Sequence, residues 1–238
     1  MKILADYHTH TIYSHGKGTI EDNVKEAISK GIEIIGISDH SYGHLTYGVK
    51  RDDIFKMREE VDFLNEKYKN QIKILLGVES NILDDKGNID YDEQVGKVLD
   101  YVMAGYHFGS KPTNFRGLLN HANNYVLKSE KSKEYNTLAI INAMKNNDIF
   151  VITHPGDKGD VYIEEIAKVA KETNTRLEIN SSHKFLNVEQ LKKIEHIGNT
   201  FIVGSDAHVP KRVGDFKLAL KTIEEAKIDV SLIENIKF

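Results

Sequence analysis

The chain alternates short apolar, β-branched runs with segments in which apolar residues recur at helical spacing. Strands that read as continuous apolar runs and alternate with helices predict a parallel sheet covered by helices. We expect seven strands that form a closed or nearly closed barrel. They cover residues 2–8, 33–40, 72–80, 100–107, 149–155, 176–182 and 200–208.

Helical segments are expected between these strands. The first one is expected to begin after Thr19, whose hydroxyl suits the N-cap position. Two helical pieces, around 118–127 and 135–145, are expected between the fourth and fifth strands. The alternative fold is an open, doubly wound sheet, but the first strand is not followed by the Gly-x-Gly-x-x-Gly turn of a dinucleotide site.

Length and composition fit one α/β domain spanning residues 1–238, because 40% hydrophobic residues can bury one sizeable core. The formal charge of −4 argues against a surface built to hold nucleic acid. No run of apolar residues is long enough to span a membrane, and we expect a cytoplasmic protein. Cysteine is absent, so any metal ligand must be nitrogen or oxygen.

Six of the seven predicted strands end in side chains that can bind a metal; only the sixth lacks an obvious one. Because the carboxyl ends of parallel barrel strands converge, these side chains are expected to meet. Taken singly, each histidine has an ordinary structural reading as a hydrogen-bonded core or edge residue. The set consists of His8, His10, His40, Glu79, His107, His154, Asp206 and His208, to which the nearby loop adds His15.

Seven of the eleven histidines belong to this set. Packing them together without a metal would leave buried donors and acceptors to satisfy, and their charged forms would repel one another. Nine donors are too many for one ion, so we expect two or three, with Glu79 suited to bridging two of them. Imidazole and carboxylate ligands suit zinc, manganese or iron alike.

The motifs DYHTH, SDH, GVES, AGYHFG, THPGD, LEINSS and GSDAH occur in this order between residue 6 and about residue 210. Together they resemble those of the PHP (polymerase and histidinol phosphatase) superfamily, and most closely those of its small stand-alone YcdX-like phosphatases. This resemblance implies a distorted (β/α)7 barrel, similar to a TIM barrel, that hydrolyses phosphoesters. A histidine at position 15 matches the YcdX-like proteins, whereas histidinol phosphatases commonly carry glutamate there, which argues against histidinol phosphate as substrate.

The resemblance also implies roles for individual residues. The family's metal ligands fall on the nine residues named above, and no position of the set is missing. The implied reaction is a metal-assisted displacement at phosphorus by an activated water. Asp206 is a candidate proton shuttle in addition to being a ligand.

Basic side chains on the loops that follow the strands are candidates for binding the substrate phosphate. Lys17 precedes the first helix, and Lys158 and Arg212 follow the fifth and seventh strands. His183, after the sixth strand, is a further substrate-binding candidate. Each of these residues could equally be a solvated loop residue.

Three functions are consistent with the sequence. The preferred one is a phosphatase acting on a small phosphomonoester. The second is a phosphodiesterase or exonuclease, for which the stretch 107–116 offers only a short set of aromatic and basic residues. The third is a metal-binding protein without turnover. The expected partner is a small phosphorylated substrate rather than nucleic acid or a membrane, and assembly into a homo-oligomer stays open.

Overall fold

Seven parallel strands form the centre of the molecule in the computed structural model, which describes residues 2–126 and 129–237. The strands are hydrogen-bonded in the order of the sequence, so each one pairs with the next along the chain. They are β2 (Ala5–Asp6), β3 (Ile34–Ile37), β4 (Lys73–Asn81), β5 (Tyr101–Gly105), β6 (Val151–Ile152), β7 (Arg176–Asn180) and β8 (Phe201–Gly204). The expected parallel barrel is confirmed.

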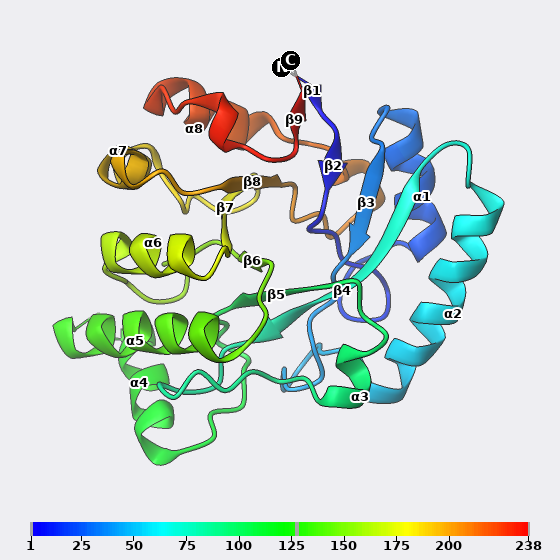
Figure 1. Cartoon of the computed structure of the whole chain (residues 1–238). Coiled ribbons are helices and arrows are strands. Elements are labelled where there is room, and N and C mark those ends of the chain that lie inside the picture. Colours follow the sequence, from blue (N-terminus) through cyan, green and yellow to red (C-terminus); the bar gives the residue numbers. More distant parts are fainter. Residues whose placement is uncertain (1, 127–128, 238) are drawn as a thin grey trace.

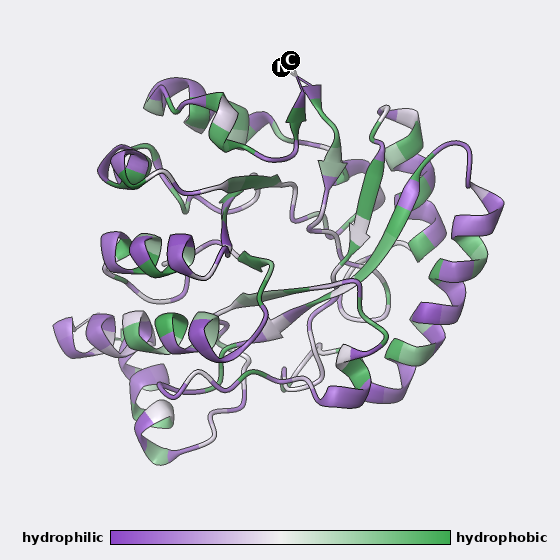
Figure 2. Ribbon diagram, in the orientation of Figure 1, coloured by the Kyte–Doolittle hydropathy of each residue, from purple (hydrophilic) through white to green (hydrophobic). Residues whose placement is uncertain are grey.

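Helices surround the strands on the outside of the barrel (Figure 1). Their hydrophobic residues face the strands and their hydrophilic residues face outward (Figure 2). The α-helices are α1 (Ile20–Ser29), α2 (Arg51–Lys67), α3 (Glu93–Gly96), α4 (Phe115–Val126), α5 (Glu130–Asn146), α6 (Ile163–Glu172), α7 (Val188–Ile194) and α8 (Lys217–Ala226). Three short 3₁₀ turns follow α7, β8 and α8: η1 (Glu195–Ile197), η2 (Pro210–Arg212) and η3 (Val230–Leu232).

The helix ends largely follow the sequence signals. Thr19 is the N-cap of α1 and forms a capping box with Asp22, as its position predicted. The helical pieces expected around 118–127 and 135–145 correspond to α4 and α5, although residue 127 lies outside the described residues. Helix α3 was not expected. Among the described residues, no helix is long and apolar enough to cross a membrane.

Several strands are shorter than their apolar runs. The run 149–155 contributes only β6, because His154 has a φ of 26° and so leaves the extended conformation. The run 200–208 ends its strand at Gly204, before Asp206 with a φ of 52°. Positive φ values are uncommon for residues other than glycine and often mark functional sites.

The first and last strands of the barrel meet through a few specific contacts. At the carboxyl ends, the His10 amide donates to the Ala207 carbonyl over 2.8 Å. At the amino ends, the Asn235 side chain donates to the carbonyls of Ala5 and Val203, both at 2.8 Å. The chain ends lie side by side (Figure 1), where β1 (Lys2–Ile3) pairs with β9 (Ile236–Lys237), an element the sequence did not predict. The barrel is therefore nearly closed.

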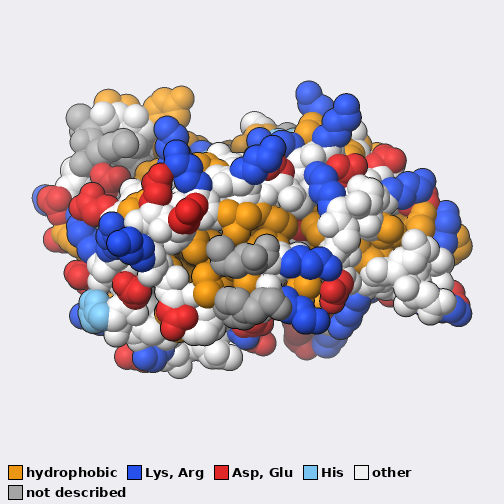
Figure 3. Space-filling view, turned by 90° about the horizontal axis from the view of Figure 1, so that it is seen from above, with side chains coloured by type: hydrophobic (Ala, Val, Ile, Leu, Met, Phe, Trp, Pro, Cys, Tyr) orange, Lys and Arg blue, Asp and Glu red, His pale blue; other side chains and the backbone are white. Residues whose placement is uncertain are grey.

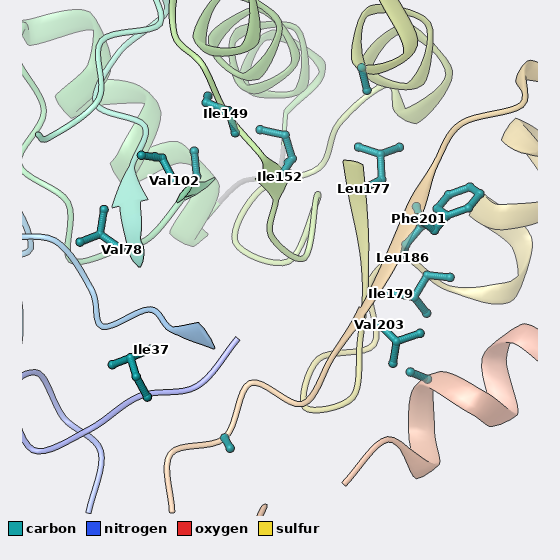
Figure 4. Close-up of a cluster of buried hydrophobic side chains, with 14 of the residues drawn as sticks. Ile37, Val78, Val102, Ile149, Ile152, Leu177, Ile179, Leu186, Phe201 and Val203 are labelled. Carbon is teal, nitrogen blue, oxygen red and sulfur yellow. The ribbon is translucent and has the colours of Figure 1, made fainter. Parts of the chain in front are cut away.

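Side chains alternate along each strand between the helices and the barrel interior. Figure 4 shows outward-facing residues of this kind, including Val78, Leu177 and Ile179, in the cluster between strands and helices. Their sequence neighbours Glu79 and Glu178 are also buried, and they point to the other face. The interior of the barrel consequently receives charged side chains from β4 and β7.

An apolar layer fills the part of the barrel interior that lies away from the carboxyl ends of the strands. Tyr101, Met103, Val151 and Ile202 form this small cluster. The Tyr101 ring lies over Gly36 and Gly77, where a Cβ atom would overlap it. Its hydroxyl donates to the Tyr7 carbonyl over 2.6 Å. This layer closes the barrel beneath its polar end.

Candidate metal centre

All nine side chains that were predicted as ligands lie together at the carboxyl ends of the strands. Their ligand atoms fall into groups in which every pair of atoms is within 4.8 Å. The groups are His10–His15–His40–His208, His8–His10–Asp206, His40–Glu79–His107 and His154–His183–Asp206. The set is therefore a continuous cluster that also includes His183.

Glu79, at the inner face of β4, lies at the centre of this cluster. Its Oε2 atom is 3.3 Å from His8 Nε2, 3.6 Å from His10 Nε2 and 3.0 Å from His40 Nδ1. Its Oε1 atom is 3.1 Å from Nε2 of both His107 and His154. The two oxygens face two different sets of imidazoles, which is the arrangement of a carboxylate that bridges two ions.

Asp206 forms the second carboxylate of the cluster. Its Oδ1 atom is 3.4 Å from His10 Nε2 and 3.3 Å from His208 Nδ1. Its Oδ2 atom is 3.2 Å from His183 Nε2 and accepts a hydrogen bond from Asn180 Nδ2, also at 3.2 Å. One oxygen thus faces the histidines of the first and last strands, and the other faces the loop after β7.

Several buried polar atoms of the cluster have no hydrogen-bond partner. They are His8 Nε2, both ring nitrogens of His10, His40 Nδ1 and Glu79 Oε2. Leaving such atoms unpaired in the interior costs free energy, and neutral imidazoles beside carboxylates are preferred ligands of divalent ions. The donor set therefore fits a metal cluster.

The pKa shifts differ among the imidazoles of the cluster, whereas those of its two carboxylates are lowered. Burial lowers the pKa of His15 to about 3 and that of His208 to about 4, with neighbouring histidines adding to the effect. Burial would raise the pKa of Glu79, but the surrounding imidazoles outweigh it and hold this pKa well below its usual range. The pKa of His40 is also lowered, mainly by burial, whereas Glu178, Asp206 and Glu79 outweigh burial at His8 and raise its pKa well above the usual value.

Two residues that contact histidines of the cluster were not predicted from the sequence. Glu178 Oε1 lies 2.6 Å from His8 Nδ1, and Asn81 Oδ1 lies 2.9 Å from His107 Nδ1. The sequence assigned no member to the sixth predicted strand, which is β7 and carries Glu178. A glutamate between Leu177 and Ile179 in an apolar run was the available signal.

The loop after β2 is held by Asp39. Its carboxylate accepts from the Thr11 amide at 2.7 Å and from the Thr11 hydroxyl at 2.6 Å. The Ser14 hydroxyl donates to the same carboxylate over 2.5 Å. These bonds fix the path of the chain between His10 and His15.

His15 lies at the outer edge of the cluster, where aromatic rings surround it. The Tyr47 ring centroid is 4.2 Å from that of His15 and 3.8 Å from that of His44. His44 is buried next to the cluster but belongs to none of the ligand groups. The Tyr47 ring therefore packs between the rings of His15 and His44.

The candidate substrate-binding residues lie on the loops around this end of the barrel. Lys17 is exposed, and its amide donates to the His208 carbonyl over 2.9 Å. Lys158 is paired with Asp157, whose carboxylate is also 3.1 Å from His183 Nδ1. Arg212 Nη2 donates to Ser182 Oγ over 3.2 Å, beside the loop that carries His183.

The remaining histidines are outside the cluster. His121 in α4 contacts the Tyr106 hydroxyl at 3.0 Å and the Phe108 carbonyl. His196 lies in η1, beyond the end of α7. Neither belongs to a candidate ligand group among the described residues.

A parallel barrel whose carboxyl end gathers imidazoles and carboxylates around a central glutamate is the architecture of a metal-dependent phosphoesterase. Residues 6–182 match the family described as the PHP domain, and the chain belongs to this family. The resemblance seen in the sequence motifs is thereby confirmed.

The chain is similar over nearly its whole length to several proteins named probable phosphatase. It is 36% identical to one from Thermoanaerobacter sp. (strain X514), over 99% of this chain and 91% of that protein. It is 31% identical to one from Acetivibrio thermocellus, over 99% of this chain and 92% of that protein.

Among solved structures, the fold resembles that of histidinol phosphate phosphatase from Lactococcus lactis, determined with zinc, L-histidinol and phosphate. The TM-score is 0.65 at 18% identity, over 94% of each chain.

Proposed function

We propose that this protein is a metal-dependent phosphatase that hydrolyses a small phosphomonoester. The observation that carries the proposal is the position of Glu79, whose two oxygens face five imidazoles from four different segments of the barrel. The names of the similar proteins, probable phosphatase, support the same reaction.

The cluster is proposed to hold two or three divalent ions, of zinc, manganese or iron. The proposed ligands are His8, His10, His15, His40, Glu79, His107, His154, Asp206 and His208. When bound, such ions lower the pKa of water and neutralise negative charge on phosphoryl oxygens. Proton transfer and binding of the substrate are assigned to side chains of the protein.

Asp206 is the proposed proton acceptor. It is ionised, because His8 and His10 outweigh the effect of burial and hold its pKa well below the usual range. Its Oδ2 atom also contacts His183, which keeps the carboxylate in one orientation. A fixed carboxylate at the cluster can accept a proton from the attacking water and return it to the leaving alcohol.

Lys17, Lys158, Arg212 and His183 are proposed to bind the non-bridging phosphate oxygens or other anionic groups of the substrate. Arg212 donates a hydrogen bond to Ser182, the residue before His183, and therefore lies near His183. Burial lowers the pKa of His183, but hydrogen bonds to Asp157 and Asp206 outweigh it and raise this pKa to about 10. The ring is therefore a cation, and its charge rather than a free N–H group would attract phosphate, because both ring nitrogens face carboxylates.

A small substrate is favoured over an oligonucleotide. Of the residues that could have formed a nucleic-acid track, Arg116 is paired with Asp85 at 2.7 Å. Basic and acidic side chains are also interspersed on the side of the molecule in Figure 3, which does not look onto the cluster. A protein that follows a phosphate backbone would instead be expected to present a groove of one charge.

The test is to reconstitute the protein separately with zinc, manganese and iron(II) and to assay it against a panel of phosphomonoesters and single-stranded oligonucleotides. Hydrolysis of at least one phosphomonoester is expected, and none by Glu79→Gln prepared in the same way. A folded protein that binds the ions and hydrolyses no phosphomonoester would overturn the proposal. Efficient cleavage of oligonucleotides alone would replace it by the nuclease alternative.

A further inference from the structure

Glu178 is a fully buried carboxylate for which the proposed reaction has no direct use. It lies in the middle of β7, where its neighbours Leu177 and Ile179 face the helices (Figure 4). On the adjacent strand β8, a Cβ atom at Gly204 would overlap the Glu178 carboxylate. The glycine therefore leaves room for this side chain inside the barrel.

Both oxygens of Glu178 have defined partners. Oε1 lies 2.6 Å from His8 Nδ1. Oε2 accepts a hydrogen bond from the His154 amide at 2.9 Å and another from Asn180 Nδ2, also at 2.9 Å. Among the described residues, no lysine or arginine pairs with this carboxylate, so His8 is its direct ionisable partner.

The contact with Glu178 determines how His8 presents its ring. Because Nδ1 donates to a carboxylate, the lone pair of the neutral ring is on Nε2. That atom is buried, has no hydrogen-bond partner and lies 3.3 Å from Glu79 Oε2 and 3.6 Å from Asp206 Oδ1. The ring is thus oriented with its free nitrogen towards the cluster.

A second imidazole of the cluster has a weaker partner in the equivalent position. His107 Nδ1 faces the amide oxygen of Asn81 at 2.9 Å, and His107 Nε2 faces Glu79. A carboxylate makes the ring it accepts from a stronger metal ligand than a neutral amide does. The two sides of Glu79 are therefore not equivalent.

We propose that Glu178 is a positioning residue that fixes the orientation and tautomer of His8 and makes the position formed by His8, His10 and Asp206 the tightest metal site of the cluster. This inference rests on the proposed metal centre. It names a residue outside the ligand set that controls the affinity for one ion, and it identifies the position that binds an ion first.

The variant Glu178→Gln keeps the size of the side chain and removes its charge. The metal-free protein would be titrated with zinc against a chromophoric chelator, which measures affinity without any assay of activity. One ion is expected to bind about 10–100-fold more weakly than in the wild type, and the others unchanged. The matched control is Asp84→Asn, which alters another buried carboxylate that contacts no imidazole and should leave all affinities unchanged.

The orientation of His8 can also be measured in a protein that retains Glu178. In the zinc-loaded wild-type protein, NMR of the imidazole nitrogens should show His8 with a proton on Nδ1 and none on Nε2, assigned by the loss of these signals in His8→Gln. The opposite tautomer would overturn the proposal even if Glu178→Gln failed to fold.

The outcomes separate this inference from the proposed function. If the wild type binds ions tightly and a folded Glu178→Gln binds them equally well, Glu178 has no positioning role, although the metal centre stands. Equal losses in Glu178→Gln and Asp84→Asn would also overturn it, because they would reflect general destabilisation. If the wild type binds no ion tightly, the metal centre and this inference both fail.

Discussion

His40 and Glu79 lie opposite each other in a parallel bridge that continues the pairing of β3 with β4, and His40 Nδ1 is 3.0 Å from Glu79 Oε2. The backbone register therefore brings the two donors together. Both side chains are buried, so packing restricts their movement.

Replacing Glu79 should affect both metal content and activity. Glu79→Gln removes the charge that faces five imidazoles, so we expect fewer bound ions and loss of phosphomonoester hydrolysis. Elemental analysis and an activity assay on the same preparation measure the two effects. The control is His196→Ala, which should behave like the wild type because His196 lies in η1. Equal damage from both variants would show that the site is misplaced.

Replacing the basic loop residues should affect substrate binding and leave the ions in place. For Lys17→Ala, Lys158→Ala and Arg212→Ala, we expect KM to rise about tenfold, which corresponds to about 1.4 kcal/mol, with kcat nearly constant. The contacts form with the bound substrate and persist during the reaction. Steady-state kinetics and metal analysis separate this effect from loss of a ligand. Wild-type kinetics in all three variants would assign phosphate binding to the ions alone.

Salt should have little effect on hydrolysis of the preferred substrate. A small phosphomonoester is attracted by the cluster rather than by a long charged groove, and the chain carries a formal charge of −4. We expect kcat/KM for the best phosphomonoester to change only slightly between low and moderate salt, and to exceed that for single-stranded DNA. Strongly salt-sensitive degradation of DNA would contradict a small-molecule phosphatase.

The apolar layer inside the barrel should not tolerate a methyl group at position 36. A Cβ atom at Gly36 would overlap the Tyr101 hydroxyl, so Gly36→Ala should destabilise the protein by about 1–3 kcal/mol. Tyr101→Phe removes that hydroxyl at the cost of its hydrogen bond to the Tyr7 carbonyl. The double variant should lose less stability than the sum of the single variants. Urea unfolding measures all three, and strict additivity would show that the two positions do not interact.

Acid should weaken the contact between α1 and α2. Hydrogen bonds from Lys67 and Tyr68 lower the pKa of Glu21 from 4.5 to about 2. Because this pKa is depressed in the folded state, the stabilisation is fully present above about pH 4.5 and is lost as the pH falls towards 2. The difference in free energy of unfolding between wild type and Glu21→Gln should shrink over this interval. A difference that is constant with pH would rule out the charged contact.

Local patterns in the sequence were enough to predict the order of the elements and the chemistry at their ends. Apolar periodicity is local, so it revealed the seven barrel strands and the helices between them. Parallel strands also have a common direction, which is why His8, Glu79 and Asp206 could be expected to meet without knowledge of any contact. Short elements such as β9, whose pairing depends on the opposite end of the chain, gave no such signal.

The side chains that support the cluster could not be predicted in this way, because their contacts depend on the tertiary structure. Glu178 and His8 are 170 residues apart, and their contact exists because the barrel nearly closes and both side chains face its interior. The same holds for Tyr47 against His15 and for His183 between Asp157 and Asp206. Periodicity shows that a strand has two faces, but it does not show what lies across the barrel from each residue. That depends on closure and packing, which involve the whole chain at once.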